Sequence, residues 1–440
     1  MKKFTFRGGT HVREHKETSS IPATRLPEPA FVSVPLSQHI GVPAKPIVSP
    51  GDHVEIGTVI GTVETGLGCP VHSSVSGTVK EITSYNNAQG QPIQSIVIEN
   101  DGLRTRAASV TPPGIKLEDA TPEQIIEIVK NAGISGLGGA TFPTYAKIQS
   151  ALGKVDKVMV NCAECEPYIT ANHRLLLERG ENVVEGLEIL MHALGVDEGI
   201  LAIEDNKMDA VKQMESVIKA RGNENLRVAV MKTKYPQGDE RQLIYAVTGR
   251  EVPAGKLPAD VGCLIVNAET SCAISRAFYR GIPLVSRIVT VEGDCIKHPR
   301  NVRAPLGASY MDLINFCGGF VKEPKKIISG GPMMGQAQWD FNAPVTKGTS
   351  AILAFSEEHD KINTIHTSCI HCGMCVHHCP MHLMPNYLAE YAQQKRYDEA
   401  EKINVMSCVE CGTCSYNCPA GVQIVQQIRV AKGVLRAKKR

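Results

Sequence analysis

Eight cysteines near the C-terminus restrict the fold of this chain more than any other feature of its sequence. They form two copies of one pattern, in which three cysteines are separated by two residues each and a fourth, followed by proline, comes after three more. The first copy begins at Cys369 and ends at Pro380, and the second begins at Cys408 and ends at Pro419. The N-terminus lacks the apolar core of a signal peptide, so we expect a cytoplasmic protein whose clustered cysteines bind metal instead of forming disulfides.

The spacing within each copy is that of bacterial ferredoxins with two [4Fe–4S] clusters. In those proteins the first three thiolates of a copy bind one cluster, and the fourth binds the other cluster. We therefore predict one cluster on Cys369, Cys372, Cys375 and Cys418, and a second on Cys408, Cys411, Cys414 and Cys379. Zinc also accepts four thiolates, but the doubled pattern with its Cys-Pro endings disfavours zinc.

Hydrophobic patterning divides the rest of the chain into further modules. Short strands broken by Gly and Pro predict a small barrel or sandwich within residues 1–110. In residues 111–286 apolar strands alternate with amphipathic helices, which predicts a parallel α/β sheet covered on both faces. Strands and Gly-Gly turns return in residues 287–345, and residues 355–440 are expected to be helical around the cysteines. The fold class is therefore multidomain α/β.

Local signals in the α/β region specify several element ends. Thr121, with Pro122 and Gln124 after it, is typical of a helix N-terminus with a capping box. Amphipathic segments that end at Gly195 and Gly222 predict two further helices, over residues 181–194 and 208–221. The expected strands begin at Lys157, Gly199, Arg227 and Cys263.

The charge balance excludes one class of function. The 47 Lys and Arg residues against 45 Asp and Glu leave a net charge of +2, which provides no field for binding nucleic acid. No apolar run approaches the ~18–20 residues of a membrane span, so we expect a soluble chain. Residues 429–440 hold six basic residues and no acidic one. They are either a contact for an acidic partner or anionic lipid, or a solvated helix end.

A glycine-rich stretch follows the first predicted helix of the α/β region. It contains Gly136, Gly138 and Gly139, and then Lys147. Glycines let backbone N–H groups approach a phosphate, and a lysine adds positive charge. The stretch is neither a Walker loop nor a Gly-x-Gly-x-x-Gly motif after a strand. From these residues alone, a phosphate site and a tight turn are equally good interpretations.

Four segments together resemble the FMN- and NADH-binding subunit of respiratory complex I. The glycine-rich stretch resembles its flavin loop, and residues 161–167 (Asn-Cys-Ala-Glu-Cys-Glu-Pro) resemble its Asn-Ala-Asp-Glu-Ser-Glu-Pro segment. Residues 238–240 resemble its Gly-Glu-Glu, and residues 267–270 resemble its Asn-Asn-Val-Glu-Thr. The four segments occur in the same order, which makes the combination specific.

The chain departs from that family at three positions. Leu137 stands where the family has Arg, Ala163 where it has Asp, and Asp239 where it has Glu. The first two changes remove polar contacts to the flavin. They make a non-catalytic, electron-carrying scaffold without flavin an alternative hypothesis.

The whole chain is similar to a narrower family, the C subunit of the Rnf ion-translocating electron-transport complex. The stretches that begin at Phe6 (Phe-Arg-Gly-Gly-Thr-His), at Pro35 (Pro-Leu-Ser-Gln-His-Ile-Gly) and at Gly249 are characteristic of it. The resemblance implies a barrel-sandwich module, a flavin domain, a β-grasp (SLBB-like) module in residues 287–345 and a ferredoxin-like double-cluster domain. In complex I the corresponding subunit has a single C-terminal cluster, so the doubled motif favours Rnf.

The resemblance also implies the cofactors and their contacts. FMN and two [4Fe–4S] clusters are expected, with NAD(H) as substrate, and no catalytic side chain is needed because hydride passes directly between cofactors. The FMN phosphate would lie at Gly136, Gly138, Gly139 and Lys147. The rest of the flavin site would be lined by Asn161, Glu164, Gly238, Asp239, Glu240, Asn267 and Thr270. The implied NAD(H) contacts are Phe142, Glu164 and Glu166.

The implied role is that of a peripheral subunit of a redox-driven ion translocase, a ferredoxin:NAD⁺ oxidoreductase. Its partners would be the integral membrane and iron–sulfur subunits of the same complex, at the cytoplasmic side of the cell membrane. A soluble corrinoid reductase of a bacterial microcompartment has a similar layout and is the second hypothesis.

Two further features of the sequence suggest roles that we do not favour. The barrel segment resembles biotinyl and lipoyl carrier domains, but its hairpin, residues 66–77, contains no lysine to carry a cofactor. Cys162 and Cys165 have the spacing of a redox pair, although buried packing is the commoner role of such cysteines.

Overall fold

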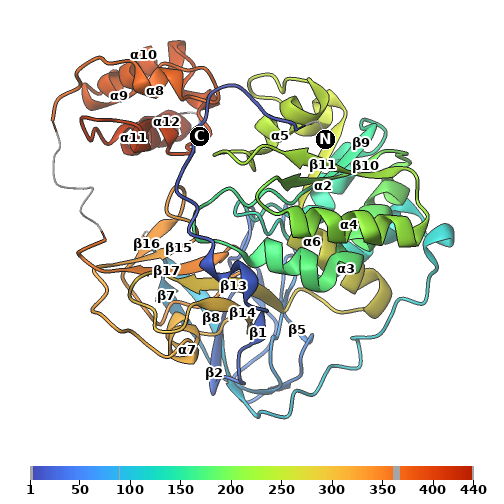
Figure 1. Ribbon diagram of the computed structural model, residues 1–440. Coiled ribbons are helices and arrows are strands. Elements are labelled where there is room, and N and C mark those ends of the chain that lie inside the picture. The colour runs from blue at the N-terminus through green and yellow to red at the C-terminus, as the bar shows by residue number, and fades with distance from the viewer. Residues whose placement is uncertain (1–2, 89, 360–366, 439–440) are drawn as a thin grey trace.

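A four-stranded parallel sheet lies at the centre of the α/β domain (Figure 1). The computed structural model describes residues 3–88, 90–359 and 367–438. The strands lie in the order β11 (Leu226–Met231), β10 (Gly199–Glu204), β9 (Lys157–Asn161) and β12 (Cys263–Asn267). All three pairings are parallel, which confirms the prediction from alternating strands and helices.

Both faces of this sheet are buried. Val158 and Val160 pack into the main hydrophobic core, whereas their neighbour Met159 packs with Ile200 and Leu243 in a second core on the opposite face. This alternation explains why the strands are apolar at nearly every position. The helices of the domain are α1 (Pro122–Asn131), α2 (Thr144–Ala151), α3 (Ala171–Leu194), α4 (Met208–Arg221), α5 (Glu240–Thr248) and α6 (Ala268–Arg280).

The predicted helix ends are present. Thr121 Oγ1 accepts a hydrogen bond from the Gln124 amide, and the Gln124 side chain accepts one from the Thr121 amide, which completes the capping box. Gly195 and Gly222 end α3 and α4 with φ angles of +62° and +64°, a conformation that glycine adopts without steric cost. The helix predicted over residues 181–194 is the second half of α3, which begins ten residues earlier at Ala171.

The N-terminal module is an all-β sandwich, as expected. One sheet has the order β2 (Phe31–Pro35), β8 (Pro92–Asn100), β7 (Gly77–Asn86) and β4 (His53–Val54). The other has the order β3 (Lys45–Pro46), β5 (Val59–Thr62) and β6 (Val71–His72). Val34, Ile60, Ile96 and Ile98 are fully buried between the two sheets and form a separate core.

A six-stranded mixed sheet with one helix, α7 (Tyr310–Phe316), follows the α/β domain. Its strand order is β1 (Thr24–Arg25), β14 (Arg300–Pro305), β13 (Ser286–Glu292), β17 (Ala351–Phe355), β15 (Lys326–Ser329) and β16 (Gln336–Gln338). Two of these strands come from outside residues 287–345. β17 is buried along its whole length and pairs with both β13 and β15, so the module extends beyond residue 345.

The cluster domain is helical and has its own core. Its helices are α8 (Met374–His377), α9 (Pro385–Gln393), α10 (Tyr397–Lys402), α11 (Thr413–Tyr416) and α12 (Ile424–Lys438). Leu388, Val405 and Ile428 are buried among them. Short 3₁₀ helices lie at Glu17–Ser20, Leu117–Asp119 and Pro258–Val261 in the earlier parts of the chain, and at Val405–Ser407 in the cluster domain. Within the described residues, no helix combines the length and the apolar character that crossing a membrane requires.

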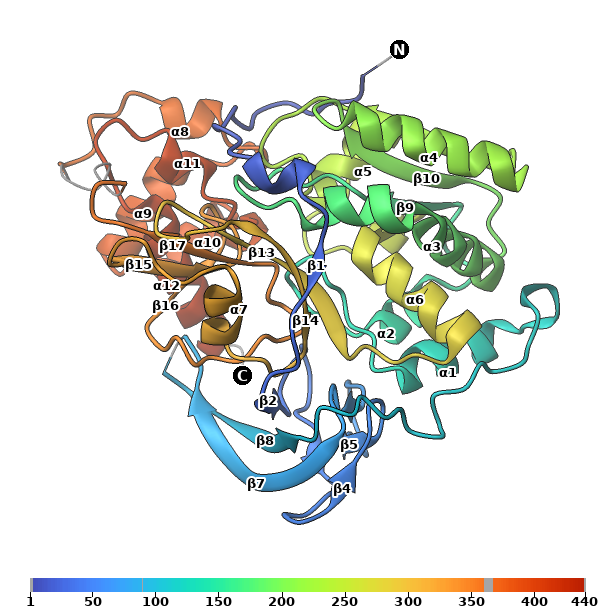
Figure 2. The same ribbon diagram turned by 60° about the horizontal axis from the view of Figure 1, so that its bottom comes forward.

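The N-terminal residues 4–16, which we call the strap, connect the α/β domain to the cluster domain. In both views the dark blue chain runs between these two parts of the molecule (Figures 1 and 2). The Phe4 amide donates to the Val230 carbonyl in β11, and the Gly9 amide donates to the His378 carbonyl in the cluster domain at 2.8 Å. The strap therefore packs outside the β-sandwich that follows it in the sequence.

Candidate redox site

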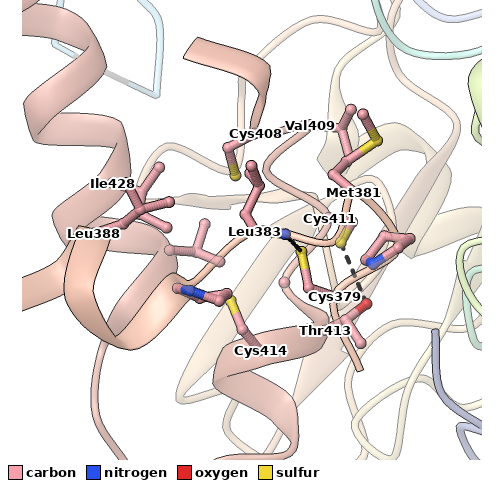
Figure 3. Close-up of a pocket in the computed structure, with 14 residues that line it drawn as sticks. Cys379, Met381, Leu383, Leu388, Cys408, Val409, Cys411, Thr413, Cys414 and Ile428 are labelled. Carbon is pink, nitrogen blue, oxygen red and sulfur yellow. Dashed lines mark hydrogen bonds between the residues drawn. The ribbon is translucent and has the colours of Figure 1, made fainter. Parts of the chain in front are cut away.

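One cavity of the cluster domain is lined by four cysteine thiols (Figure 3). Three of them, Cys408, Cys411 and Cys414, belong to the second copy of the motif. The other one, Cys379, is the fourth cysteine of the first copy. Leu383 and Leu388 close the cavity with apolar surface. This is the combination of cysteines that the predicted cross-over requires.

The chemistry of these thiols suits a cluster. Burial raises the pKa of the Cys408 thiol to about 11 and also raises that of Cys414, where the charges of neighbouring cysteines add to the effect. Four thiolates at this position therefore need bound positive charge, which iron supplies. In the described part of the chain, no three His, Cys, Asp or Glu side chains converge closely enough for a single metal ion.

The two motif copies fold into equivalent turns. His371 and Gly373 in the first copy have positive φ angles of +53° and +77°, and Glu410 and Gly412 in the second have +58° and +83°. In each copy the turn places a backbone amide against the sulfur of the first cysteine. The His371 amide donates to Cys369 Sγ, and the Glu410 amide donates to Cys408 Sγ, both at 3.4 Å. Amide donors of this kind stabilise cluster sulfurs and help set their potential.

The residues predicted to bind flavin meet at the carboxyl edge of the central sheet. Asn161 at the end of β9 and Asn267 at the end of β12 are direct partners in the parallel register. Asn161 Nδ2 donates to the Gly238 carbonyl at 2.7 Å, and a Cβ at Gly138 would lie 3.4 Å from the Asn267 Cβ. Ligands of open parallel sheets bind at this edge.

Hydrogen bonds connect the two ends of the glycine-rich loop to each other and connect the loop to the carboxyl edge of the central sheet. The Gly136 amide donates to the Phe142 carbonyl at 2.8 Å, and the Leu137 amide donates to Thr270 Oγ1 at 2.9 Å. Gly139 has a φ angle of +112° and faces open space. The side chain of Leu137 is buried in the main hydrophobic core, at the position where the related family has Arg.

Charged residues of the predicted site flank this loop. Lys147 Nζ lies 3.1 Å from Glu240 Oε2, and both side chains are partly exposed. Asp239 begins α5 and accepts hydrogen bonds from the amides of Arg241 and Gln242. Burial raises the pKa of Asp239, although these two amides oppose the shift.

Two of the implied NAD(H) contacts have structural partners. The Glu164 carboxylate accepts hydrogen bonds from the first amides of α3, those of Asn172 and His173. The Glu166 carboxylate accepts from two amides of the loop before β16, at 3.0 Å each, and burial raises the pKa of Glu166 to about 7. Phe142, in contrast, is 36% exposed at the end of the glycine-rich loop.

Sequence reasoning missed two buried cations beneath the loop. Lys347 Nζ donates to the Gly133 carbonyl at 2.6 Å. Arg287 donates to the Leu137 carbonyl at 3.3 Å and pairs with Glu269 at 3.0 Å. Both cations come from the six-stranded module, far from the loop in sequence, and no local pattern marks them.

None of the fifteen cysteines forms a disulfide. Burial raises the pKa of both Cys162 and Cys165. The Cys165 sulfur accepts a hydrogen bond from the Gly238 amide, so this pair has packing and hydrogen-bonding roles beside the flavin motif.

Comparison with known protein families identifies all four modules. The RnfC barrel sandwich hybrid domain matches residues 4–103, and the Nuo51 FMN-binding domain matches residues 129–276. The SLBB domain matches residues 288–337, and a 4Fe-4S dicluster domain matches residues 368–422. The predicted fold class and cofactor domains are therefore confirmed.

Similar proteins extend over the full length of the chain. One, from Acetobacterium woodii, is the C subunit of a Na(+)-translocating ferredoxin:NAD(+) oxidoreductase complex, 47% identical over 100% of this chain and 99% of its own. Another, the C subunit of the ion-translocating oxidoreductase complex of Rhodobacter capsulatus, is 40% identical over 99% of this chain and 84% of its own.

Solved structures share the fold at lower identity. A chain of an NAD⁺-reducing [NiFe]-hydrogenase in the H₂-reduced state superposes with a TM-score of 0.54 and 18% identity. The match covers 72% of this chain and 62% of the hydrogenase chain.

Proposed function

The chain belongs to the C-subunit family of Rnf-type, ion-translocating ferredoxin:NAD⁺ oxidoreductase complexes, and from this we propose that it exchanges electrons between NAD(H) and two [4Fe–4S] clusters through FMN. The observation that carries the proposal is the arrangement at the sheet edge. The glycine-rich loop, Asn161 and Asn267 meet there, and the four-thiol cavity lies in the domain packed beside it. The flavin, when bound, converts two-electron hydride transfer into one-electron steps.

The residues of this edge suit the parts of FMN. Gly138 and Gly139 carry no side chains, so their backbone amides can turn toward a phosphate. Lys147 supplies the positive charge. Asn161 and Asn267 lie side by side at this edge. Their side-chain oxygens accept from the Ala163 and Glu269 amides, so their remaining N–H groups are what they can offer to the polar edge of the ring. The buried side chains of Lys347 and Arg287 donate hydrogen bonds to the carbonyls of Gly133 and Leu137. These bonds position the loop before FMN binds.

Cofactor content and reduction by NADH test this function. Protein purified without oxygen should contain FMN together with about eight iron and eight sulfide, as two [4Fe–4S] clusters require. NADH should then bleach the flavin absorbance. Iron and sulfide at this level without any flavin would instead support the scaffold hypothesis, in which Leu137 and Ala163 have abolished FMN binding.

We further propose that the chain docks on integral membrane and iron–sulfur subunits at the cytoplasmic face of the cell membrane, where NAD(H) is available. The names of its relatives support membership in a multi-subunit, ion-translocating complex. The basic tail is a weaker candidate contact: Arg429 and Lys432 pair with Glu410, and Lys438 pairs with Asp398, so these charges are already used inside the domain. The last two basic residues lie outside the described residues.

Membrane fractionation tests the docking. At low ionic strength we expect the chain in the membrane fraction together with integral subunits, because a peripheral protein is held there by its partners. Membranes from cells that lack the integral subunits are the control, and the chain should leave them. Complete recovery in the soluble fraction, without any co-purifying integral subunits, would contradict docking.

A further inference from the structure

A small cavity behind the glycine-rich loop is lined by four arginines. It lies where α3 and α6, which pack side by side, meet β13 and β14 of the six-stranded sheet (Figure 2). Leu137 of the glycine-rich loop forms part of the same wall. Four different elements each contribute one arginine: Arg179 on α3, Arg276 on α6, Arg287 on β13 and Arg303 on β14.

The positive charge of this wall exceeds its negative charge. Among the described residues that line the cavity, Glu269 is the one acidic side chain. Its carboxylate is already used, because Oε2 pairs with Arg287 at 3.0 Å and Oε1 accepts from the Ile288 amide at 2.8 Å. Four arginines against one glutamate leave a net charge of +3 around the cavity. The wall therefore attracts an anion.

Three of the arginines have no partner of their own. Arg179, Arg276 and Arg303 are partly buried, and their guanidinium groups make no hydrogen bond or ion pair within the described part of the chain. Burial lowers the pKa of both Arg276 and Arg303, and the charge of Arg179 adds to the effect. Like charges that are partly shielded from water repel, so the three side chains are held together unfavourably without a counter-ion.

Arg287 is the most buried of the four and also has a free donor. Its side chain belongs to a residue that is 3% exposed. Its terminal nitrogens donate to the carbonyls of Lys347 and Leu137 and to the Glu269 carboxylate. Its Nε atom is buried and has no hydrogen-bond partner among the described residues. Because an unpaired buried donor is unfavourable, a ligand atom that accepts from Nε would be stabilised.

The size of the cavity indicates which part of a ligand enters it. The open space of about 20 Å³ is enough for a water-sized group, such as one oxygen of an oxyanion. The other oxygens would lie at the mouth, where the partly buried guanidinium groups reach solvent. A guanidinium group donates two parallel hydrogen bonds to phosphate, so several of them around one tetrahedral anion are complementary to it in charge and in shape.

We propose that this arginine cavity binds a phosphate group, carried either by free phosphate or by a nucleotide. The site is separate from the electron-transfer function proposed above, and no cluster cysteine is among the described residues that line it. It lies behind the predicted flavin loop: Leu137 faces the cavity, whereas the next residue, Gly138, lies against Asn267 at the sheet edge. A bound anion would hold Arg287 where it donates to the Leu137 carbonyl, and would thereby stabilise the loop.

Phosphate binding to the full-length protein, purified without oxygen and with its cofactors, tests the site. We would measure bound radiolabelled phosphate by equilibrium dialysis at constant ionic strength, with chloride as the balancing anion. One phosphate should bind per chain. Arg276→Gln and Arg303→Gln should each weaken binding at least about tenfold, because each removes charge-assisted hydrogen bonds. The two variants lie on separate elements, so a folding defect in one of them does not decide the test.

Arg280→Gln is the matched control. Arg280 is exposed at the end of α6 and does not line the cavity. Its replacement removes the same charge from the same helix, and this variant should bind phosphate as the wild type does. Unchanged binding in both cavity variants, or equal weakening in Arg280→Gln, would overturn the proposal. Loss of FMN together with phosphate in both cavity variants would also overturn it, because the cavity would then belong to the flavin site.

Competition with AMP identifies the source of the phosphate group. Displacement of the label by less AMP than unlabelled phosphate would indicate a nucleotide, and the reverse order would indicate free phosphate. A wild-type protein that binds neither would overturn the proposal. The melting temperature is an independent measurement: at equal ionic strength, phosphate should raise it in the wild type and in Arg280→Gln but not in Arg276→Gln.

Discussion

Cys379→Ala should abolish the cluster of the second motif copy, although Cys379 belongs to the first. The physical reason is the geometry of the cavity, where Cys379 lies with Cys408, Cys411 and Cys414. A [4Fe–4S] cluster that loses one of its four protein ligands loses most of its binding energy at that site. EPR of the reduced protein, together with iron and sulfide content, should show near-complete loss of one cluster and retention of the other.

The mirror variant and a buried control make this test specific. Cys418→Ala should remove the cluster on Cys369, Cys372 and Cys375 and spare the other. Cys317→Ala changes a buried cysteine of the six-stranded module, so both clusters should remain. Because the cluster domain has its own hydrophobic core, FMN should stay bound in all three variants. Loss of the Cys369 cluster in Cys379→Ala would contradict the cross-over.

Gly138→Val should yield a folded protein that contains both clusters but little FMN. A Cβ at this position lies 3.4 Å from the Asn267 Cβ, which is an ordinary contact distance, and Gly138 does not have a positive φ angle. The fold should therefore tolerate valine. Its branched methyl groups, however, would fill the space before Asn267 where the resemblance places the flavin. We expect FMN affinity to fall at least about tenfold, or ~1.4 kcal/mol.

Flavin fluorescence after denaturation, with the melting temperature, measures this effect. Gly433→Val is the matched control, because Gly433 is exposed on helix α12 and a Cβ there meets nothing within 4 Å. The control should retain FMN and keep or slightly raise its melting temperature, because valine is a better helix former than glycine. Normal FMN content in folded Gly138→Val would remove the glycine-rich loop from the flavin site.

The module order could be predicted because short-range patterns encode it. Alternating apolar strands and amphipathic helices specified the parallel sheet, and Thr121, Gly195 and Gly222 specified helix ends through backbone chemistry within four residues. The cysteine spacing specified two ligand sets for the same reason, since three thiols per set are close in the chain.

The assignment of NAD(H) contacts shows where a resemblance alone was insufficient. It named Glu164 and Glu166 from their places in a motif. The structure gives both carboxylates backbone partners, the first turn of α3 for Glu164 and the loop before β16 for Glu166. Those partners lie up to 168 residues away in the sequence, so the motif itself could not include them. The two NAD(H) contacts remain predictions.

The sequence by itself determined which elements form, which cysteines come in sets and which cofactor domains the chain contains. Only the tertiary structure decided that β1 and β17 complete one sheet, that the strap bridges two domains, and that Arg287 and Lys347 support the glycine-rich loop. It also decided which cluster site is buried against the α/β domain. The physical reason is the range of the interactions: periodicity and capping act over a few residues, whereas these contacts join segments that become neighbours only when the whole chain has folded.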